Sequence, residues 1–193
     1  MQIIDVLLLV VKGEGPEGLC GRTLLQKKVY FLSVLLNEPY GFTAHYYGPY
    51  SSYVAGNLES LVNCGFLDEN TESFAAAAGD KNLFGEIRRH TYTLTNDGEV
   101  VWSDIEKEQD YEKWKNALNL INKQPISNDF NKLSIAAKVH YIIDWREKGT
   151  IGEVKQVAEE YGWDVKAEDI ESVLSFLKEL GLVTTDESDD IPF

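Results

Sequence analysis

The sequence is poor in the features that mark membrane, secreted and metal-binding proteins. Its longest aliphatic run, Val6 to Val11, has six residues, far fewer than the ~20 that a membrane-spanning helix needs. No Lys or Arg precedes this run, as a secretion signal would require. The two cysteines, Cys20 and Cys64, lie far apart and predict no disulfide scaffold, redox motif or zinc site. We therefore expect a cytoplasmic protein without a bound metal.

Basic residues are also scarce. The 193 residues include 18 Lys and Arg against 32 Asp and Glu, which gives a net charge of −14. The deficit holds in both halves, with 7 basic against 13 acidic groups over 1–105 and 11 against 19 over 106–193. Because phosphate contacts by cations supply most nucleic-acid affinity, this composition disfavours a broad nucleic-acid interface.

Sequence signatures of catalysis are missing. The three histidines, His45, His90 and His140, stand in no H-E-x-x-H spacing, and there is no G-x-S-x-G or G-x-x-x-x-G-K-[ST] motif. The sequence therefore predicts neither an enzyme nor a cofactor.

One structural unit occurs twice, at an offset of 116 positions. In each copy, apolar residues at i, i+4 and i+7 form one face of a helix, a Gly ends the helix, and an apolar pair follows. This order is typical of the third helix of a winged helix-turn-helix and the start of its wing. The matching pairs are Val54 and Ile170, Leu58 and Leu174, Leu61 and Leu177, Gly65 and Gly181, Phe66 and Leu182, and Leu67 and Val183.

The segments around the first copy predict a complete winged unit over residues 1–97. We expect helices over 2–12 and from about 22 to 36, then the third helix, and strands over 66–74 and 86–94 around a tip at 75–85. The first helix is apolar nearly all round, which predicts burial on more than one side.

A connecting helix is expected over 98–124. Tyr111, Trp114, Leu118 and Ile121 give it a narrow apolar face, suited either to packing within the chain or to a two-fold partner. A second helix-turn-helix unit over 125–185 includes the capping box Thr150–Glu153, and an acidic tail follows over 186–193. The expected fold class is mainly α with a small antiparallel β wing, as tandem winged helix-turn-helix domains.

Three stretches of the first half, GRTLLQKKVYFL, HYYGPYSSYV and LVNCGFL, carry the motifs R-T-x-L-Q-K and Y-G-P-Y-S. They resemble the YwgA-like winged-helix family of bacteria and archaea and, more distantly, the Panacea antitoxin-associated domains. The resemblance implies a winged-helix fold and a regulatory role, and it supplies no catalytic residues.

The outward face of each third helix bears on the choice between DNA and protein as partner. In the first copy this face carries no positive charge, and in the second it is mostly acidic. Five tyrosines lie between positions 40 and 53, and tyrosine is favoured both in scaffolds and at protein interfaces. We predict that the first copy contacts a protein partner or a second copy of the chain through Tyr50, Tyr53, Gly56, Asn57 and Ser60.

DNA contact through the wing of the first unit is the alternative. The candidate cations are Arg22, Lys27, Arg88, Arg89 and His90. The competing interpretation is that Arg88 and Arg89 pair with the abundant carboxylates. For Lys28, inside the apolar arc of the second helix, we expect the four-carbon stem to carry the amine to the helix edge. The favoured function is thus a non-catalytic regulatory protein, with a DNA-binding transcriptional regulator as the alternative.

Overall fold

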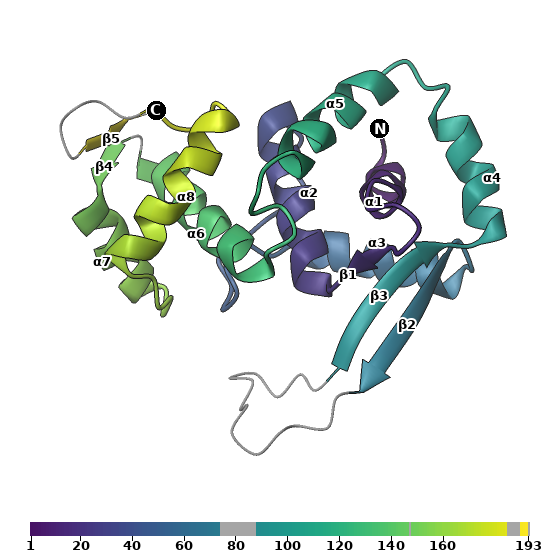
Figure 1. Cartoon of the computed structure of the whole chain (residues 1–193), viewed down its shortest axis with the longest axis horizontal. Coiled ribbons are helices and arrows are strands. Elements are labelled where there is room, and N and C mark those ends of the chain that lie inside the picture. The colour runs from purple at the N-terminus through teal and green to yellow at the C-terminus, as the bar shows by residue number, and fades with distance from the viewer. Residues whose placement is uncertain (74–87, 147, 185–189, 193) are drawn as a thin grey trace.

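The computed structural model describes residues 1–73, 88–146, 148–184 and 190–192. Over these residues the protein is mainly helical, with eight helices, a three-stranded antiparallel sheet and a two-stranded sheet (Figure 1). No helix in this described part is both long and apolar enough to cross a bilayer. The expected class, mainly α with a small antiparallel sheet, is confirmed. The tip expected at 75–85 lies outside the described residues.

Helix α1 (Ile3–Lys12) forms the centre of the N-terminal half. Residues Val6–Val11 are all buried, because α2 (Arg22–Leu36), α3 (Ser52–Asn63) and the sheet pack around α1. The prediction of burial on more than one side is confirmed. The bounds expected for the second helix are also confirmed.

The three-stranded sheet has the order β1-β3-β2, from β1 (Leu19–Cys20), β3 (Arg88–Leu94) and β2 (Leu67–Ser73). Its register pairs Leu67 with Leu94 and Leu19 with Tyr92. Helix α3 leads into β2 through Gly65, whose φ of 77° is the left-handed conformation expected for the residue that ends this helix. The two expected strands of the first unit are therefore present.

The stretch 98–124 contains the rest of α4 (Asn96–Ile105) and the whole of α5 (Tyr111–Asn122), so the single connecting helix is replaced by two. The apolar face of α5, with Trp114 and Ile121 at its centre, is buried within the chain, where α5 packs on α2 and α1. This face is therefore used for internal packing and not for a two-fold partner.

The C-terminal half consists of α6 (Phe130–Arg146), β4 (Lys148–Thr150), α7 (Ile151–Glu160), α8 (Ala167–Glu179) and β5 (Asp190–Pro192). The predicted capping box of Thr150 and Glu153 starts α7. Gly181 again follows the third helix in the left-handed region, but no strand begins at Leu182. Instead β5, in the expected acidic tail, pairs with β4 ahead of α7.

Helix α6 joins the two halves, because it packs on α8 and also on α2 (Figure 1). The rings of Phe31 and Phe176 meet with centroids 5.0 Å apart. The indole Nε1 of Trp163 donates to the carbonyl of His45 at 2.7 Å. The two halves thus share one continuous hydrophobic core.

Candidate functional site

The outward face of α3 is exposed as predicted. Tyr53 is 54% exposed, Gly56 and Ser60 are exposed, and Asn57 is half-buried. The Asn57 amide donates to the Tyr53 carbonyl and the Ser60 hydroxyl to the Gly56 carbonyl, so their hydrogen bonds stay within the helix. Glu59 is the one charged residue here, and a polyanion would find no cation on this face.

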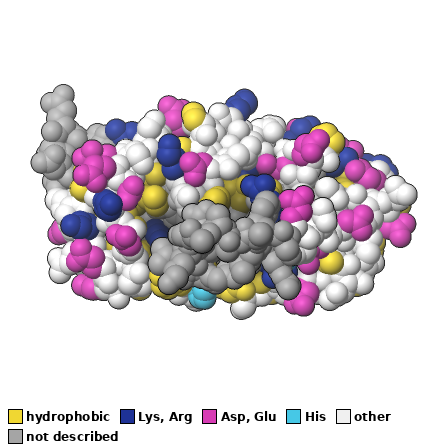
Figure 2. All heavy atoms as spheres, turned by 60° about the horizontal axis from the view of Figure 1, so that its bottom comes forward, with side chains coloured by type: hydrophobic (Ala, Val, Ile, Leu, Met, Phe, Trp, Pro, Cys, Tyr) yellow, Lys and Arg dark blue, Asp and Glu magenta, His cyan; other side chains and the backbone are white. Residues whose placement is uncertain are grey.

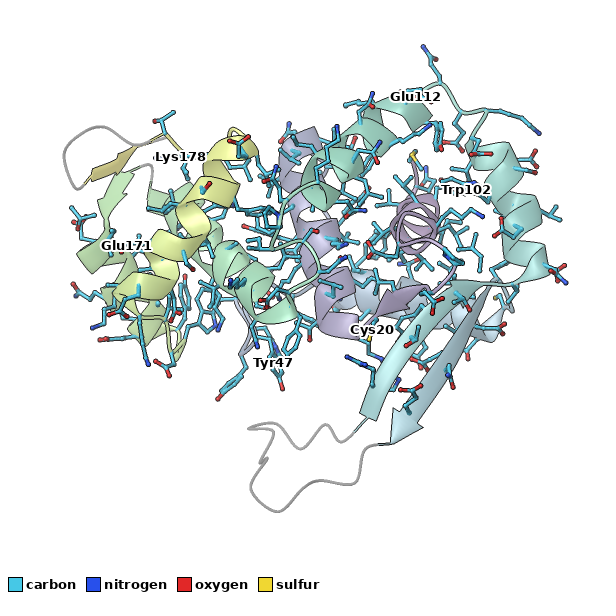
Figure 3. The ribbon with its side chains drawn as sticks, in the orientation of Figure 1. Cys20, Tyr47, Trp102, Glu112, Glu171 and Lys178 are labelled. Carbon is cyan, nitrogen blue, oxygen red and sulfur yellow. The ribbon has the colours of Figure 1, made fainter. Side chains whose placement is uncertain are left out.

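The corresponding face of α8 is more acidic. It carries the exposed residues Glu168, Glu171, Ser172, Ser175 and Glu179, with Lys178 as the single exposed cation of α8. Glu171 and Lys178 are labelled in Figure 3. Both third helices therefore present faces that repel phosphate, which agrees with the prediction made from the sequence.

The five clustered tyrosines divide by burial. Tyr40 is buried in the core, Tyr47 and Tyr50 are half-buried, and Tyr46 and Tyr53 are more than half exposed. Tyr50 also forms a backbone bridge with Thr43 that closes the loop before α3. The cluster therefore contains both a core residue, Tyr40, and surface residues, Tyr46 and Tyr53.

The candidate DNA-contacting cations do not form one free patch. Lys27 is only 1% exposed, so it has no surface to offer to a phosphate, and we no longer place it in a DNA interface. Arg22 is exposed but bonded to Glu69, Arg89 is exposed, and the side chain of Arg88 lies outside the described residues. In the face shown in Figure 2 the visible Lys and Arg side chains lie singly among Asp and Glu.

Glu69 on β2 organises this side of the sheet. Its Oε1 accepts from Nη2 of Arg22 at 2.9 Å and from the Tyr92 hydroxyl, and His90 Nδ1 lies 3.1 Å away. Arg22 Nε also donates to the Tyr92 hydroxyl at 2.9 Å. Although burial opposes ionisation, the bonds from Tyr92 and Arg22 outweigh it and lower the pKa of Glu69. Arg22 is therefore paired with a carboxylate, the arrangement that the competing interpretation assigned to Arg88 and Arg89.

The two motifs of the first half come together in space. The Gln26 amide donates to the Ser51 carbonyl at 3.0 Å, and its oxygen accepts from the Ser51 N–H at 3.1 Å. Lys27 Nζ donates to the Pro49 carbonyl at 2.7 Å. Ser51 in turn caps α3, since its hydroxyl accepts from the Val54 N–H. The R-T-x-L-Q-K motif thus holds the Y-G-P-Y-S loop, and the loop sets the start of α3.

Two hollows adjoin at the first turns of α2 and share Arg22, Thr23 and Tyr47. The larger, a cleft of about 1020 Å³, lies between this end of α2, β3 and α6. Tyr47 and Cys20 line it and appear on either side of the lower end of α2 in Figure 3. The smaller, a pocket of about 540 Å³, lies between α2, α3 and the sheet. Hollows of this size are typical of small-molecule sites.

The expectation for Lys28 was wrong. Its side chain is fully buried, and its amine binds Glu14, Asn122 and Asn128. These acceptors come from segments that the sequence does not place next to α2, so local helix geometry could not reveal them.

The remaining candidates form no metal site in the described residues. Cys20 and Cys64 are free thiols. No group of three or more His, Cys, Asp or Glu side chains is arranged to hold a metal over these residues. His140 is 2% exposed and bonds the Tyr30 hydroxyl at 2.8 Å through Nδ1, and burial lowers its pKa to about 4.

No known protein family matches this chain, and no curated protein is significantly similar to it. The resemblance to the YwgA-like and Panacea groups therefore stays a prediction, and the function has to be argued from the geometry.

Proposed function

We propose that this chain is a non-catalytic regulatory protein that acts mainly by binding another protein through the exposed face of α3. The observation that carries the proposal is the character of this face, where Tyr53 is 54% exposed beside Gly56 and Ser60 and no Lys or Arg is present. Tyrosine offers a large contact area with few rotatable bonds and is enriched at interface hot spots. The partner is a different protein or a second copy of the chain.

The arrangement of the elements supports tandem winged-helix units as the architecture behind this role. Residues 1–97 run through three helices and a pair of antiparallel strands, β2 and β3, which take the place of a wing. Residues 125–185 supply three further helices, the last followed by a left-handed Gly. The third helices, α3 and α8, are the elements that such units present to partners.

DNA contact through the first unit is the second candidate. Its supporting observation is that Arg22, Arg89 and His90 line the same cleft. Against it, Arg22 and His90 are already engaged by Glu69, and the face of α3 that would enter a groove repels phosphate.

Two matched variants separate these functions. Ser60 on α3 and Ser172 on α8 are both exposed, and each hydroxyl bonds a carbonyl of its own helix. Ser60→Arg and Ser172→Arg therefore add the same charge to the exposed face of each third helix. The experiment purifies tagged wild-type and variant chains, after nuclease treatment, from cells that make the protein naturally.

We expect a partner in fixed proportion with the wild type and with Ser172→Arg, and its loss with Ser60→Arg. If the partner is a second copy of the chain, the purified complex would have twice the mass of the chain in the wild type and in Ser172→Arg, and this doubling would be lost in Ser60→Arg. If the purified wild type instead bound added duplex DNA, and Ser60→Arg bound it more tightly, the DNA candidate would replace the proposal.

A further inference from the structure

Two neighbouring lysines of α2 are buried and differ sharply in their surroundings. Lys27 and Lys28 are 1% and 0% exposed. An ammonium group carries three donors and no acceptor, and burying it is costly unless it is paired. The number and charge of the hydrogen-bond acceptors around each amine therefore indicate whether that lysine has a structural role or a binding role.

The amine of Lys28 has an acceptor for each of its three donors. Its three donors meet three acceptors, the carboxylate of Glu14 and the amide oxygens of Asn122 and Asn128, the last two at 2.9 and 3.0 Å. Charge and hydrogen-bonding capacity are both satisfied within the chain, so this lysine is a structural element.

Lys27 is provided with a single neutral acceptor, the Pro49 carbonyl at 2.7 Å. Among the described residues it has no carboxylate within ion-pair distance, and two of its donors have no partner there. Burial, together with the nearby charge of Lys138, lowers the pKa of Lys27 to about 7. An anion beside Lys27 would supply the negative charge and the hydrogen-bond acceptors that the described residues do not provide.

The space for such a group is the pocket of about 540 Å³, whose wall includes Lys27. Arg22 lines the same pocket and uses one donor on Glu69 and one on Tyr92, so three of its five remain. Polar groups and an apolar side complete the wall. The titratable groups are His45, Tyr47, Tyr50, Glu59, Glu69 and Tyr92, and the apolar side is formed by Ala55, Leu58 and Val62.

The two carboxylates of the pocket do not compensate Lys27. Glu69 is engaged by Arg22 and Tyr92, and Glu59 is an exposed residue on the outward side of α3. The wall therefore combines an uncompensated ammonium, spare guanidinium donors and apolar surface, which is the chemistry that recognises an organic anion.

We propose that this pocket binds a small organic oxyanion, a carboxylate or a phosphate ester, with Lys27 and Arg22 as its cationic donors and the apolar side of α3 against its carbon skeleton. The site is separate from the protein-contact role, because it needs no partner protein. It also touches the loop that starts α3, since Lys27 holds the Pro49 carbonyl.

The test titrates the full ¹⁵N-labelled chain with benzoate, sulfate and neutral benzamide and follows backbone amide resonances. Benzoate and sulfate keep their charge between pH 6 and 8, and benzamide keeps the ring of benzoate without the charge. We expect saturable shifts with benzoate around Thr23, Gln26 and Ser51, and none with benzamide. Sulfate shows whether a tetrahedral anion is accepted without the ring.

The pH dependence of benzoate affinity identifies the group responsible. With a pKa of about 7, the ammonium fraction of Lys27 falls about tenfold from pH 6 to pH 8, so the affinity falls by about the same factor. Lys27→Arg keeps the charge and removes this dependence. Lys27→Met loses the saturable response.

Three outcomes would overturn the proposal. They are equal binding of benzamide and benzoate, unchanged benzoate affinity in Lys27→Met, and no saturable shift with either anion. If Lys27→Met does not fold, the wild type and Lys27→Arg compared at pH 6 and 8 still decide the question. The result stands apart from the purification experiment with the Ser60 and Ser172 variants, which reports on the α3 face alone.

Discussion

Gln26 and Ser51 exchange two hydrogen bonds across 25 positions of sequence, at 3.0 and 3.1 Å, and both residues are buried. Ser51 also caps α3. This pair therefore fixes the start of α3, which we propose as the partner-binding surface, relative to α2.

Removal of the Gln26 side-chain amide leaves the N–H of Ser51 buried without a partner, while the Ser51 carbonyl still accepts from the Ala55 N–H. We expect Gln26→Leu to lower the free energy of unfolding by about 1 to 3 kcal/mol, the cost of one orphaned buried group. Urea unfolding measures this loss. Gln156 on α7 is exposed, so Gln156→Leu is the matched control and should change stability little. Equal losses at both positions would contradict the role given to Gln26.

The adjacent lysines predict opposite effects of one substitution. Lys28→Met leaves the carboxylate of Glu14 buried without its cation, and we expect stability to fall by about 3 to 5 kcal/mol. Lys27→Met loses one hydrogen bond to the Pro49 carbonyl, but it also removes the cost of burying an unpaired ammonium. We therefore expect its stability at pH 7 to equal or exceed that of the wild type. A large loss from Lys27→Met would show that this lysine is structural like its neighbour.

Two helical glycines predict opposite responses to alanine. A Cβ on Gly56 would meet nothing within 4 Å, so Gly56→Ala should raise stability by about 0.5 to 1 kcal/mol through helix propensity. A Cβ on Gly98 would lie 2.2 Å from the Phe66 carbonyl oxygen, so Gly98→Ala should destabilise the fold. Thermal unfolding of both variants measures the difference. A loss of stability in Gly56→Ala would mean that its surroundings are tighter than the structure shows.

His140 predicts a dependence of stability on pH. Burial lowers its folded-state pKa to about 4, against ~6.5 in the unfolded chain, so the unfolded chain binds more protons between these values. The contribution is complete above pH ~6.5 and decreases as the pH falls toward 4, with a slope of ~1.4 kcal/mol per pH unit. Urea unfolding between pH 7 and 4.5 measures the slope. His140→Gln should remove the part of this slope that one bound proton contributes.

The features that the sequence reveals are those set by local chemistry. Helix α2 begins and ends where its apolar spacing indicates, and the capping box of Thr150 and Glu153 needs only four consecutive residues. The same holds for the exposed face of α3, because helical periodicity alone assigns Tyr53 and Gly56 to the outside.

Features that depend on distant segments could not be predicted in this way. Lys28 finds acceptors 14, 94 and 100 positions away. Lys27 looked like a surface cation because nothing in its own helix shows that the loop at Pro49 covers it. Strand β5 pairs with β4, directly ahead of α7. No local sequence pattern predicts this pairing between distant segments.

The central claim, that α3 meets a protein and not DNA, is tested most directly by photocrosslinking in the cell. A benzophenone amino acid is placed at Tyr53, 54% exposed on α3, and separately at Tyr161, 41% exposed in the C-terminal half. The account predicts a discrete protein adduct from position 53 that is absent from position 161. An adduct to DNA from position 53, or the same protein adduct from both positions, would contradict it.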